Sequence, residues 1–149
     1  MPHAHLGPAD AAGFWLDHPA HRAFLKAEAA RQFAFFAASP RRYPDFAPGF
    51  HVLGHDGAPL PAPLQELHTT TRLVHSYALG VASGIPGAGE IVDLGMDYLW
   101  SHHRDASHGG YVWGVAGDAV ADGRKLAYGH VFVLLAAASA KMAGHPDAD

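Results

Sequence analysis

The pattern of apolar and polar positions predicts four helices along the chain. Apolar residues recur at helical spacing over about residues 17–39, 64–83, 87–103 and 125–143. Pro19 fits the first turn of the first helix, because the N–H that proline lacks has no intrahelical partner there. Gly95 is a weak point within the third helix, since glycine lowers helix stability. The Pro-rich stretch 40–49 separates the first helix from the rest.

Short strand signals lie between these helices. Residues 50–53 are predicted to form a strand that turns at His55-Asp56-Gly57, and residues 108–115 a second, aromatic strand. Asp-Gly favours a hairpin turn because glycine adopts a positive φ without steric cost. Strand, turn and helix recur at a shift of about sixty residues, which is typical of stacked helix pairs. We therefore predict an all-α fold of helix pairs with short β-hairpins between helices.

The fourth predicted helix has an uneven distribution of polar residues. Its first turn carries Lys125, Tyr128 and His130, whereas residues 131–140 are apolar apart from one serine. A helix that is apolar on all faces is normally buried on every side. We therefore expect the body of this helix to be enclosed and its polar end to face a cavity.

Length and composition are those of one folded domain. The chain has 149 residues, of which 49% are hydrophobic and 16% are charged. A net charge of −4 and a pI near 6.3 argue against a nucleic-acid surface, which needs clustered basic residues. The sequence contains no cysteine, so a reducing compartment suits it.

The sequence shows no signal for secretion or for insertion into a membrane. The N-terminus lacks the basic start and the apolar core of about 7–15 residues that a secretory signal needs. The longest apolar run, residues 131–140, is far shorter than the roughly 20 residues of a membrane span. We therefore expect a cytoplasmic protein with no membrane partner, and we expect residues 1–16 to be flexible.

Two motifs carry a family resemblance. The first is ELHTTTRLVHSY (66–77), and the second combines GGYVW (109–113) with KLAYGHVFVLLA (125–136). From about residue 50 to its end the chain resembles the N-acylglucosamine 2-epimerase family. Within the family it is most similar to the aldose–ketose isomerases for mannose-type sugars and sulfoquinovose. The resemblance implies six helix pairs that close into an (α/α)6 barrel with the sugar site at one mouth. Since four helices make two pairs, residues 1–149 are expected to be the N-terminal third of one barrel domain.

Arg72 is the first candidate for substrate binding. His68, Arg72 and His75 share one face of the predicted second helix, and Arg72 matches the arginine of the family motif. A guanidinium fork can hold sugar hydroxyl oxygens and can stabilise an enediolate oxygen. A capping or surface salt-bridge role is the alternative for Arg72. His75 is expected to do no more than support the Arg72 side chain.

Three further residues are candidates for the substrate-binding wall: Tyr128, Trp113 and His130. The family places a substrate-contacting tyrosine at the position of Tyr128, where a phenol can hydrogen-bond a sugar hydroxyl while its ring packs on the sugar. A tyrosine of the core is the alternative. Trp113 is either a stacking platform or part of the strand packing. His130 either reaches the pocket or is a hydrogen-bonded core histidine.

The thirteen histidines do not form a recognisable metal motif. The nearest candidates are His102 and His103 with His108, and His3 with His5, but the chain has no HExxH motif and no cysteine. Adjacent histidines on a helix point about 100° apart, so they rarely bind one ion. The glycine-rich stretch 84–89 follows no predicted strand and lacks the lysine of a phosphate loop. We expect neither a metal nor another cofactor.

The resemblance implies a cofactor-free isomerase or 2-epimerase that acts on a monosaccharide through a cis-enediol. Histidines supply the acid and the base in that family. Their motifs lie on later helices, so no catalytic residue is assigned in this chain, and the chain alone is expected to be inactive. One alternative is a non-catalytic carbohydrate-binding or interaction module that self-associates through exposed apolar helix faces. A metal-dependent hydrolase is another.

Overall fold

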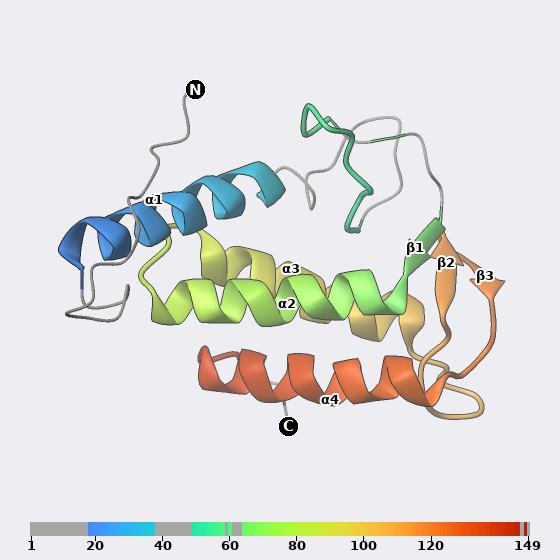
Figure 1. Cartoon of the computed structure of the whole chain (residues 1–149). Helices are drawn as coiled ribbons and strands as arrows, with labels where there is room; N and C mark the ends of the chain where they lie inside the picture. The colour runs from blue at the N-terminus through green and yellow to red at the C-terminus, as the bar shows by residue number, and fades with distance from the viewer. Residues whose placement is uncertain (1–17, 38–48, 59, 61–63, 147, 149) are drawn as a thin grey trace.

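The computed structural model describes residues 18–37, 49–58, 60, 64–146 and 148. This part of the chain is mostly helical and carries one small antiparallel sheet (Figure 1). The elements follow in the order α1 (Pro19–Phe36), β1 (Leu64–Glu66), α2 (Leu67–Ala82), α3 (Ala88–Tyr98), a π-helical turn (Leu99–His103), β2 (Gly114–Ala116), β3 (Ala119–Asp122) and α4 (Ala127–Met142). The four predicted helices are therefore confirmed, with shifted ends. The expected flexibility of residues 1–16 lies outside the described residues.

Helices α2, α3 and α4 form the body of the molecule. α2 packs against both α3 and α4. α2 and α4 run in the same direction, and α3 returns the chain between them in the opposite direction (Figure 1). The first turns of α2 and α4 therefore lie at the same end of the molecule, next to the sheet. Residues 66–72 and 126–132, which make up this end, are called the rim below.

The core lies where these three helices meet. It is built from apolar side chains of each helix: Leu67, Val74, Tyr77 and Ala78 of α2, Ala88, Val92 and Met96 of α3, and Val133, Ala136 and Ala140 of α4. Gly95 is a point of close approach in this core. A Cβ at Gly95 would lie 2.4 Å from Cγ2 of Val74 and 2.9 Å from the ring of Phe50. Glycine thus weakens α3 by its propensity but lets α3 come close to α2.

The sheet joins the starts of α2 and α4. β1 pairs with β2, and β2 pairs with β3, all antiparallel, with Gln65 opposite Val115. β1 continues directly into α2, and the chain enters α4 shortly after β3. The prediction that the second helix begins at residue 64 is wrong, because residues 64–66 pair with β2. The predicted strand 108–115 begins only at Gly114, since Gly109 and Gly110 have positive φ angles and form a loop.

Residues 50–58 form a hairpin-shaped loop rather than the predicted strand. The backbone N–H of Leu60 donates to the carbonyl of Val52 at 2.8 Å, and that of Gly54 donates to the carbonyl of Ala58 at 2.7 Å. The predicted turn at His55-Asp56-Gly57 is confirmed. Gly57 has a φ of 80° there, which explains why glycine occupies this position.

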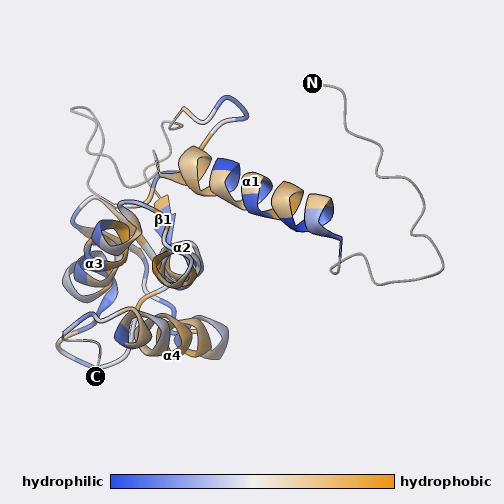
Figure 2. Cartoon of the chain, turned by 90° about the vertical axis from the view of Figure 1, so that its left-hand side faces the viewer, coloured by the Kyte–Doolittle hydropathy of each residue, from blue (hydrophilic) through white to orange (hydrophobic). Residues whose placement is uncertain are grey.

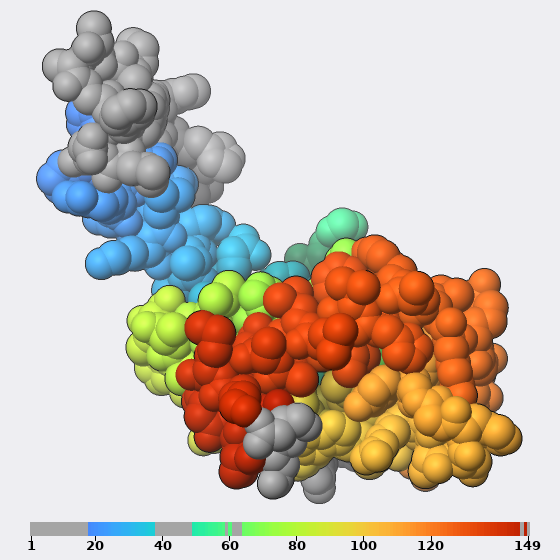
Figure 3. Space-filling view, turned by 90° about the horizontal axis from the view of Figure 1, so that it is seen from below, coloured from blue at the N-terminus to red at the C-terminus, as the bar shows by residue number. Residues whose placement is uncertain are grey.

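Helix α1 has no buried residue and projects away from the other helices (Figures 2 and 3). Its contact with the body runs through Phe33. The hydroxyl of Tyr77 donates to the carbonyl of Phe33 at 2.6 Å, and the two rings meet edge to face at 5.2 Å. Burial raises the pKa of Tyr77 to about 12. The phenol is therefore a permanent donor to α1 at neutral pH.

The expectation that α4 is enclosed on every side is wrong. Only Gly129, Val133, Ala136, Ser139 and Ala140 are buried. The opposite face is exposed, and Leu134 and Met142 retain 72% and 88% of their accessible surface. The reason is that, among the described residues, α4 has helical neighbours only on the side of α2 and α3. In the described part of the chain, no helix combines the length and the apolar character that crossing a membrane requires.

His103 links the π-helical turn to the segment that enters the sheet. Its side chain is fully buried, and Nδ1 lies 3.1 Å from the carbonyl oxygen of Val112. Because a carbonyl can only accept, Nδ1 carries the proton. The backbone N–H of Val112 donates in return to the carbonyl of His103 at 2.8 Å. Burial lowers the pKa of His103, although the hydrogen bond to Val112 opposes this effect.

The His103→Asn variant tests this role. Asparagine keeps an N–H donor near the Nδ1 position but does not titrate, and its smaller size should destabilise the fold by about 1–3 kcal/mol at pH 8. The neutral histidine stabilises the wild type above the ordinary histidine pKa of about 6.5, and this stabilisation is lost as the pH falls towards the lowered value. The difference in Tm between the two proteins should therefore shrink from pH 8 to pH 5 in thermal unfolding followed by circular dichroism. Since the other histidines are common to both proteins, a constant difference would contradict the role of His103.

Candidate functional site

Arg72 and Tyr128 meet at the rim. Arg72 lies in the second turn of α2 and Tyr128 in the first turn of α4. Nη2 of Arg72 donates a hydrogen bond to the Tyr128 hydroxyl oxygen at 2.5 Å, and both side chains are exposed. The parallel course of the two helices explains the meeting, because it places their first turns side by side. The structure thus brings together the two first candidates of the sequence.

A third side chain, which the sequence interpretation missed, contacts both members of this pair. Phe132 lies one turn after Tyr128 on α4, and Cζ of Arg72 lies 4.6 Å from the centroid of its ring. Cζ of Arg72 is 6.0 Å from the ring of Tyr128. A spacing of four residues places two side chains on one helix face. This spacing is the signal that could have indicated Phe132 in the sequence.

Trp113 lies beside the rim and is held there by three neighbours. Its ring stacks on that of His68 at 5.0 Å with an interplanar angle of 10°, and it lies 6.3 Å from the ring of Tyr128. Its indole N–H donates to Oε1 of Glu66 at 3.1 Å. Gly129 lets α4 approach closely here, since a Cβ would lie 3.5 Å from the indole ring and 2.8 Å from Leu67. Trp113 is therefore part of the same group as Arg72 and Tyr128.

Glu66 and His68 are two further members of the group that the sequence interpretation did not assign. Oε2 of Glu66 lies 3.7 Å from Nδ1 of His68, while its other oxygen accepts the indole N–H of Trp113. Both residues belong to the motif 66–77, and His68 shares the helix face of Arg72. Their contact with Trp113 could not be predicted, because it depends on the pairing of β1 with β2.

His130 is placed apart from this group. Its Nδ1 lies 2.9 Å from the carbonyl oxygen of Leu126, and its Nε2 accepts the backbone N–H of Tyr111 at 3.1 Å. These two bonds assign the proton to Nδ1. Both ring nitrogens are thus engaged by the backbone, and His130 fastens the loop before β2 to the start of α4. Of the two roles considered for His130, this geometry matches the hydrogen-bonded core histidine and not a residue that reaches the pocket.

His75 fastens α2 to α4 further from the rim. Its Nδ1 lies 2.8 Å from Oγ of Ser139, whose hydroxyl donates to the carbonyl oxygen of Leu135 at 2.6 Å. Since the only proton of the Ser139 hydroxyl is used in that bond, Nδ1 of His75 must donate to Oγ. His75 therefore helps to set the position of α2 along α4, on which the meeting of Arg72 with Tyr128 depends.

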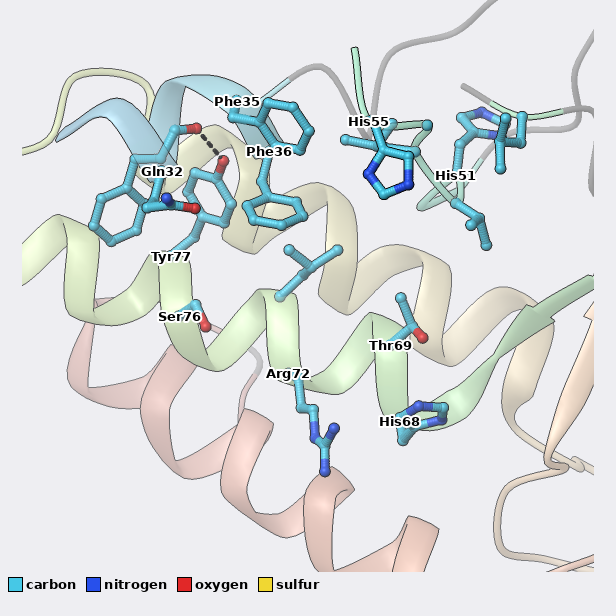
Figure 4. A pocket seen from close by; sticks show the side chains of 16 residues that line it. Gln32, Phe35, Phe36, His51, His55, His68, Thr69, Arg72, Ser76 and Tyr77 are labelled. Atoms are coloured by element: carbon cyan, nitrogen blue, oxygen red, sulfur yellow. Dashed lines mark hydrogen bonds between the residues drawn. The ribbon is translucent and has the colours of Figure 1, made fainter. Parts of the chain in front are cut away.

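A cavity of about 1170 Å³ lies beside the rim, between α1, residues 51–55 with Leu60, and α2. Its lining is mainly apolar: α1 contributes aromatic rings, among them Phe35 and Phe36, and α2 contributes Leu73 and Tyr77 beside the polar residues His68, Thr69, Arg72 and Ser76. Figure 4 shows Arg72 pointing from α2 towards α4, at the edge of this cavity. The Arg72 side chain thus leaves the mainly apolar cavity and joins Tyr128 at the rim.

Asp105 fixes the loop that leads to Trp113. Its carboxylate accepts the backbone N–H groups of Ser107 and His108 at 3.0 Å each and binds Nζ of Lys125 at 2.7 Å. The hydrogen bonds from Lys125 and from His108 hold the pKa of Asp105 well below its usual range. Because Lys125 lies just before α4, this carboxylate connects the loop to the rim.

Metal-binding side chains do not gather in the described residues. No group of three histidine, aspartate or glutamate side chains could hold an ion there. The three histidines considered as metal ligands have separate partners. His102 stacks on Tyr98, His103 is hydrogen-bonded to the carbonyl of Val112, and Nδ1 of His108 lies 3.4 Å from Oδ2 of Asp105. His3 and His5 lie outside the described residues.

The fold and the rim together define a protein of paired helices with a polar site between their first turns. A model of the N-acylglucosamine 2-epimerase (GlcNAc 2-epimerase) family matches residues 49–149. The chain belongs to this family. D-mannose isomerase of Thermobifida fusca is 48% identical over 139 residues, which are 90% of this chain and 32% of that protein. D-mannose isomerase of Pseudomonas cannabina pv. alisalensis is 34% identical over 134 residues, 90% of this chain and 31% of that protein.

Solved structures resemble the chain as well. The crystal structure of a D-mannose isomerase matches with a TM-score of 0.75 at 27% identity, over 85% of this chain and 32% of that chain. Cellobiose 2-epimerase from Spirochaeta thermophila matches in fold with a TM-score of 0.65 at 24% identity, over 85% of this chain and 33% of that chain. The chain spans about a third of the length of the relatives that it matches.

The Asp105→Asn variant tests how the loop is held. Asparagine has the same size but loses the ion pair with Lys125, so the Tm at pH 7 should fall. The carboxylate stabilises the fold above the ordinary aspartate pKa of about 3.9, and this contribution is lost as the pH falls towards the lowered value. The difference in Tm between the wild type and Asp105→Asn should therefore narrow below about pH 4. Asp97→Asn, at an exposed position on α3, is the matched control. If wild type and Asp105→Asn differed in Tm by the same amount at pH 2.5 and at pH 7, the Asp105 charge would not hold the loop.

Proposed function

We propose that this chain supplies the first two helix pairs of an (α/α)6-barrel sugar isomerase or 2-epimerase. In this proposal Arg72, Tyr128 and Trp113 form part of the wall that binds a mannose-type monosaccharide. The observation that carries the proposal is the hydrogen bond between Arg72 and Tyr128 at the rim. The names of the relatives, D-mannose isomerase in both sequence matches, support the substrate class.

The rim is rich in hydrogen-bond donors. Because the Tyr128 oxygen accepts from Arg72, the phenol keeps its own proton to donate to a sugar oxygen. Arg72 retains further N–H groups, since a guanidinium has five. The first turns of α2 and α4 add the partial positive charge of helix N-termini. Such an arrangement favours a sugar hydroxyl and, more strongly, an oxygen that becomes negative in an enediolate.

The reaction in this proposal proceeds through a cis-enediol. A base removes the proton from C2 of the open-chain aldose, and return of the proton to C1 yields the ketose, whereas return to C2 yields the epimer. Arg72 and Tyr128 would stabilise the oxygen that becomes negative. No residue of this chain is assigned as the acid or the base. His130 is unsuited to either role, because both of its ring nitrogens bind backbone groups.

A second candidate function is a non-catalytic carbohydrate-binding or interaction module. The exposed face of α4 favours it. Val131, Leu134, Leu135 and Met142 form an apolar surface that continues from Tyr128 along the helix. Exposed apolar surfaces of this kind mark sites of association. Self-association of the chain through this face belongs to this second candidate.

Titration with D-mannose tests the substrate-binding wall. Arg72→Met should weaken binding of D-mannose and D-fructose about tenfold or more, because a charge-assisted hydrogen bond is lost. Arg31→Met, at an exposed position on α1, is the matched control and should bind as the wild type does. Isothermal titration calorimetry or ligand-observed NMR provides the measurement. Binding that is equally strong in Arg72→Met would remove Arg72 from the site.

The purified chain should not interconvert D-mannose and D-fructose. The proposal places the acid and the base outside these 149 residues, so the binding wall alone cannot transfer the C2 proton. Incubation with D-mannose, followed by chromatographic detection of D-fructose, checks this expectation. A turnover in the usual enzymatic range of about 1–10³ s⁻¹ would show that the chain contains its own acid and base.

A further inference from the structure

Phe132 contacts both members of the polar pair at the rim. It lies on α4, one turn after Tyr128, and is half-buried. Its ring meets that of Tyr128 edge to face, with centroids 4.9 Å apart at an angle of 71°. On its other side Cζ of Arg72 lies over the ring at 4.6 Å from the centroid. A guanidinium at this distance is attracted by the negative face of the ring.

Arg72 needs such a contact to keep one orientation. Among the described residues, no carboxylate forms an ion pair with Arg72, and the hydroxyl of Tyr128 is its hydrogen-bond partner. An arginine side chain has many rotamers, and holding it in one of them is opposed by conformational entropy. One hydrogen bond at Nη2 leaves the plane of the guanidinium free to turn. A ring over Cζ restricts that rotation.

We propose that Phe132 is the positioning residue of the sugar-binding wall. It holds the Arg72 guanidinium by a cation–π contact and the Tyr128 ring by an edge-to-face contact. This inference rests on the proposed function for its meaning, although the contact itself can be tested without a sugar. An aromatic ring suits this task better than a carboxylate. It restrains the cation while leaving its charge uncompensated and its in-plane N–H groups available to a sugar oxygen.

The position of Arg72 can be measured directly by NMR of the ¹⁵N-labelled chain. Protons over the face of an aromatic ring are shielded, so the side-chain Nε–Hε signal of Arg72 should lie upfield of that of the exposed Arg31. Arg72→Met identifies the signal by removing it. In Phe132→Leu the signal should move downfield, towards the position of an exposed arginine, whereas in Phe132→Tyr it should stay upfield. An unchanged signal in Phe132→Leu would overturn the proposal.

Stability provides the necessary control. Leucine keeps an apolar side chain at a half-buried helical position, so Phe132→Leu should remain folded, as judged by circular dichroism and by the amide spectrum. If it does not fold, Phe132→Tyr and Phe132→Met replace it: the tyrosine should preserve the shielding, and the methionine should remove it. Shielding that survives in Phe132→Met would likewise overturn the proposal.

Binding of D-mannose links the position of Arg72 to the proposed function. Phe132→Leu should weaken binding about two- to fivefold, the size expected of one exposed cation–π contact, and Phe132→Tyr should not. In an Arg72→Met background Phe132→Leu should have a smaller effect, since only its contact with Tyr128 is then left to lose. A loss of D-mannose affinity as large as that in the wild-type background would overturn the proposal. If the wild type binds no sugar, the proposed function fails, and the Arg72 signal still decides the role of Phe132.

Discussion

The close parallel packing of α2 on α4 is the constraint on which the rest of the structure depends. The buried face of α4 consists largely of small residues, which let the two helix backbones come near each other. Two polar contacts then lock the helices along their length, Arg72 with Tyr128 at the rim and His75 with Ser139 further along. A helix that shifted by one turn would lose both contacts at once. Packing and candidate site are therefore parts of one interface.

The sheet gives this interface its register at the rim. β1 runs into α2 without a linker, and β2 precedes α4 by a short hairpin, so pairing of β1 with β2 fixes where both helices begin. The same pairing brings Glu66 to Trp113, and the loop before β2 is held by Asp105 and by His130. The three short strands thus fix the relative positions of the loop and the two helices. They place an aromatic side chain from the loop beside Tyr128, a residue of the helix.

The sequence predicts the parts of this arrangement that depend on local pattern, and misses those that depend on distant partners. The four helices and the glycine turn follow from spacing and turn chemistry, and the choice of Arg72 and Tyr128 for one candidate site follows from the family motifs. The strand at residues 64–66 does not, because its apolar spacing also fits a helix and only β2 decides between them. The exposure of α4 could not be predicted from its composition, since burial depends on which neighbours surround a helix. His130 lies in the right motif, but the carbonyl of Leu126 and the N–H of Tyr111 occupy its nitrogens.

The exposed apolar face of α4 and the candidate site are physically continuous. Tyr128 begins the stripe that Val131, Leu135 and Met142 extend along the helix, and Arg72 lies against its first turn. An element that covered this stripe would therefore also remove water from the guanidinium and the phenol. A hydrogen bond from a charged group strengthens as the local dielectric falls. An element packed on α4 would thus also strengthen the hydrogen bond between Arg72 and Tyr128, because the hydrophobic surface and the polar pair share one helix face.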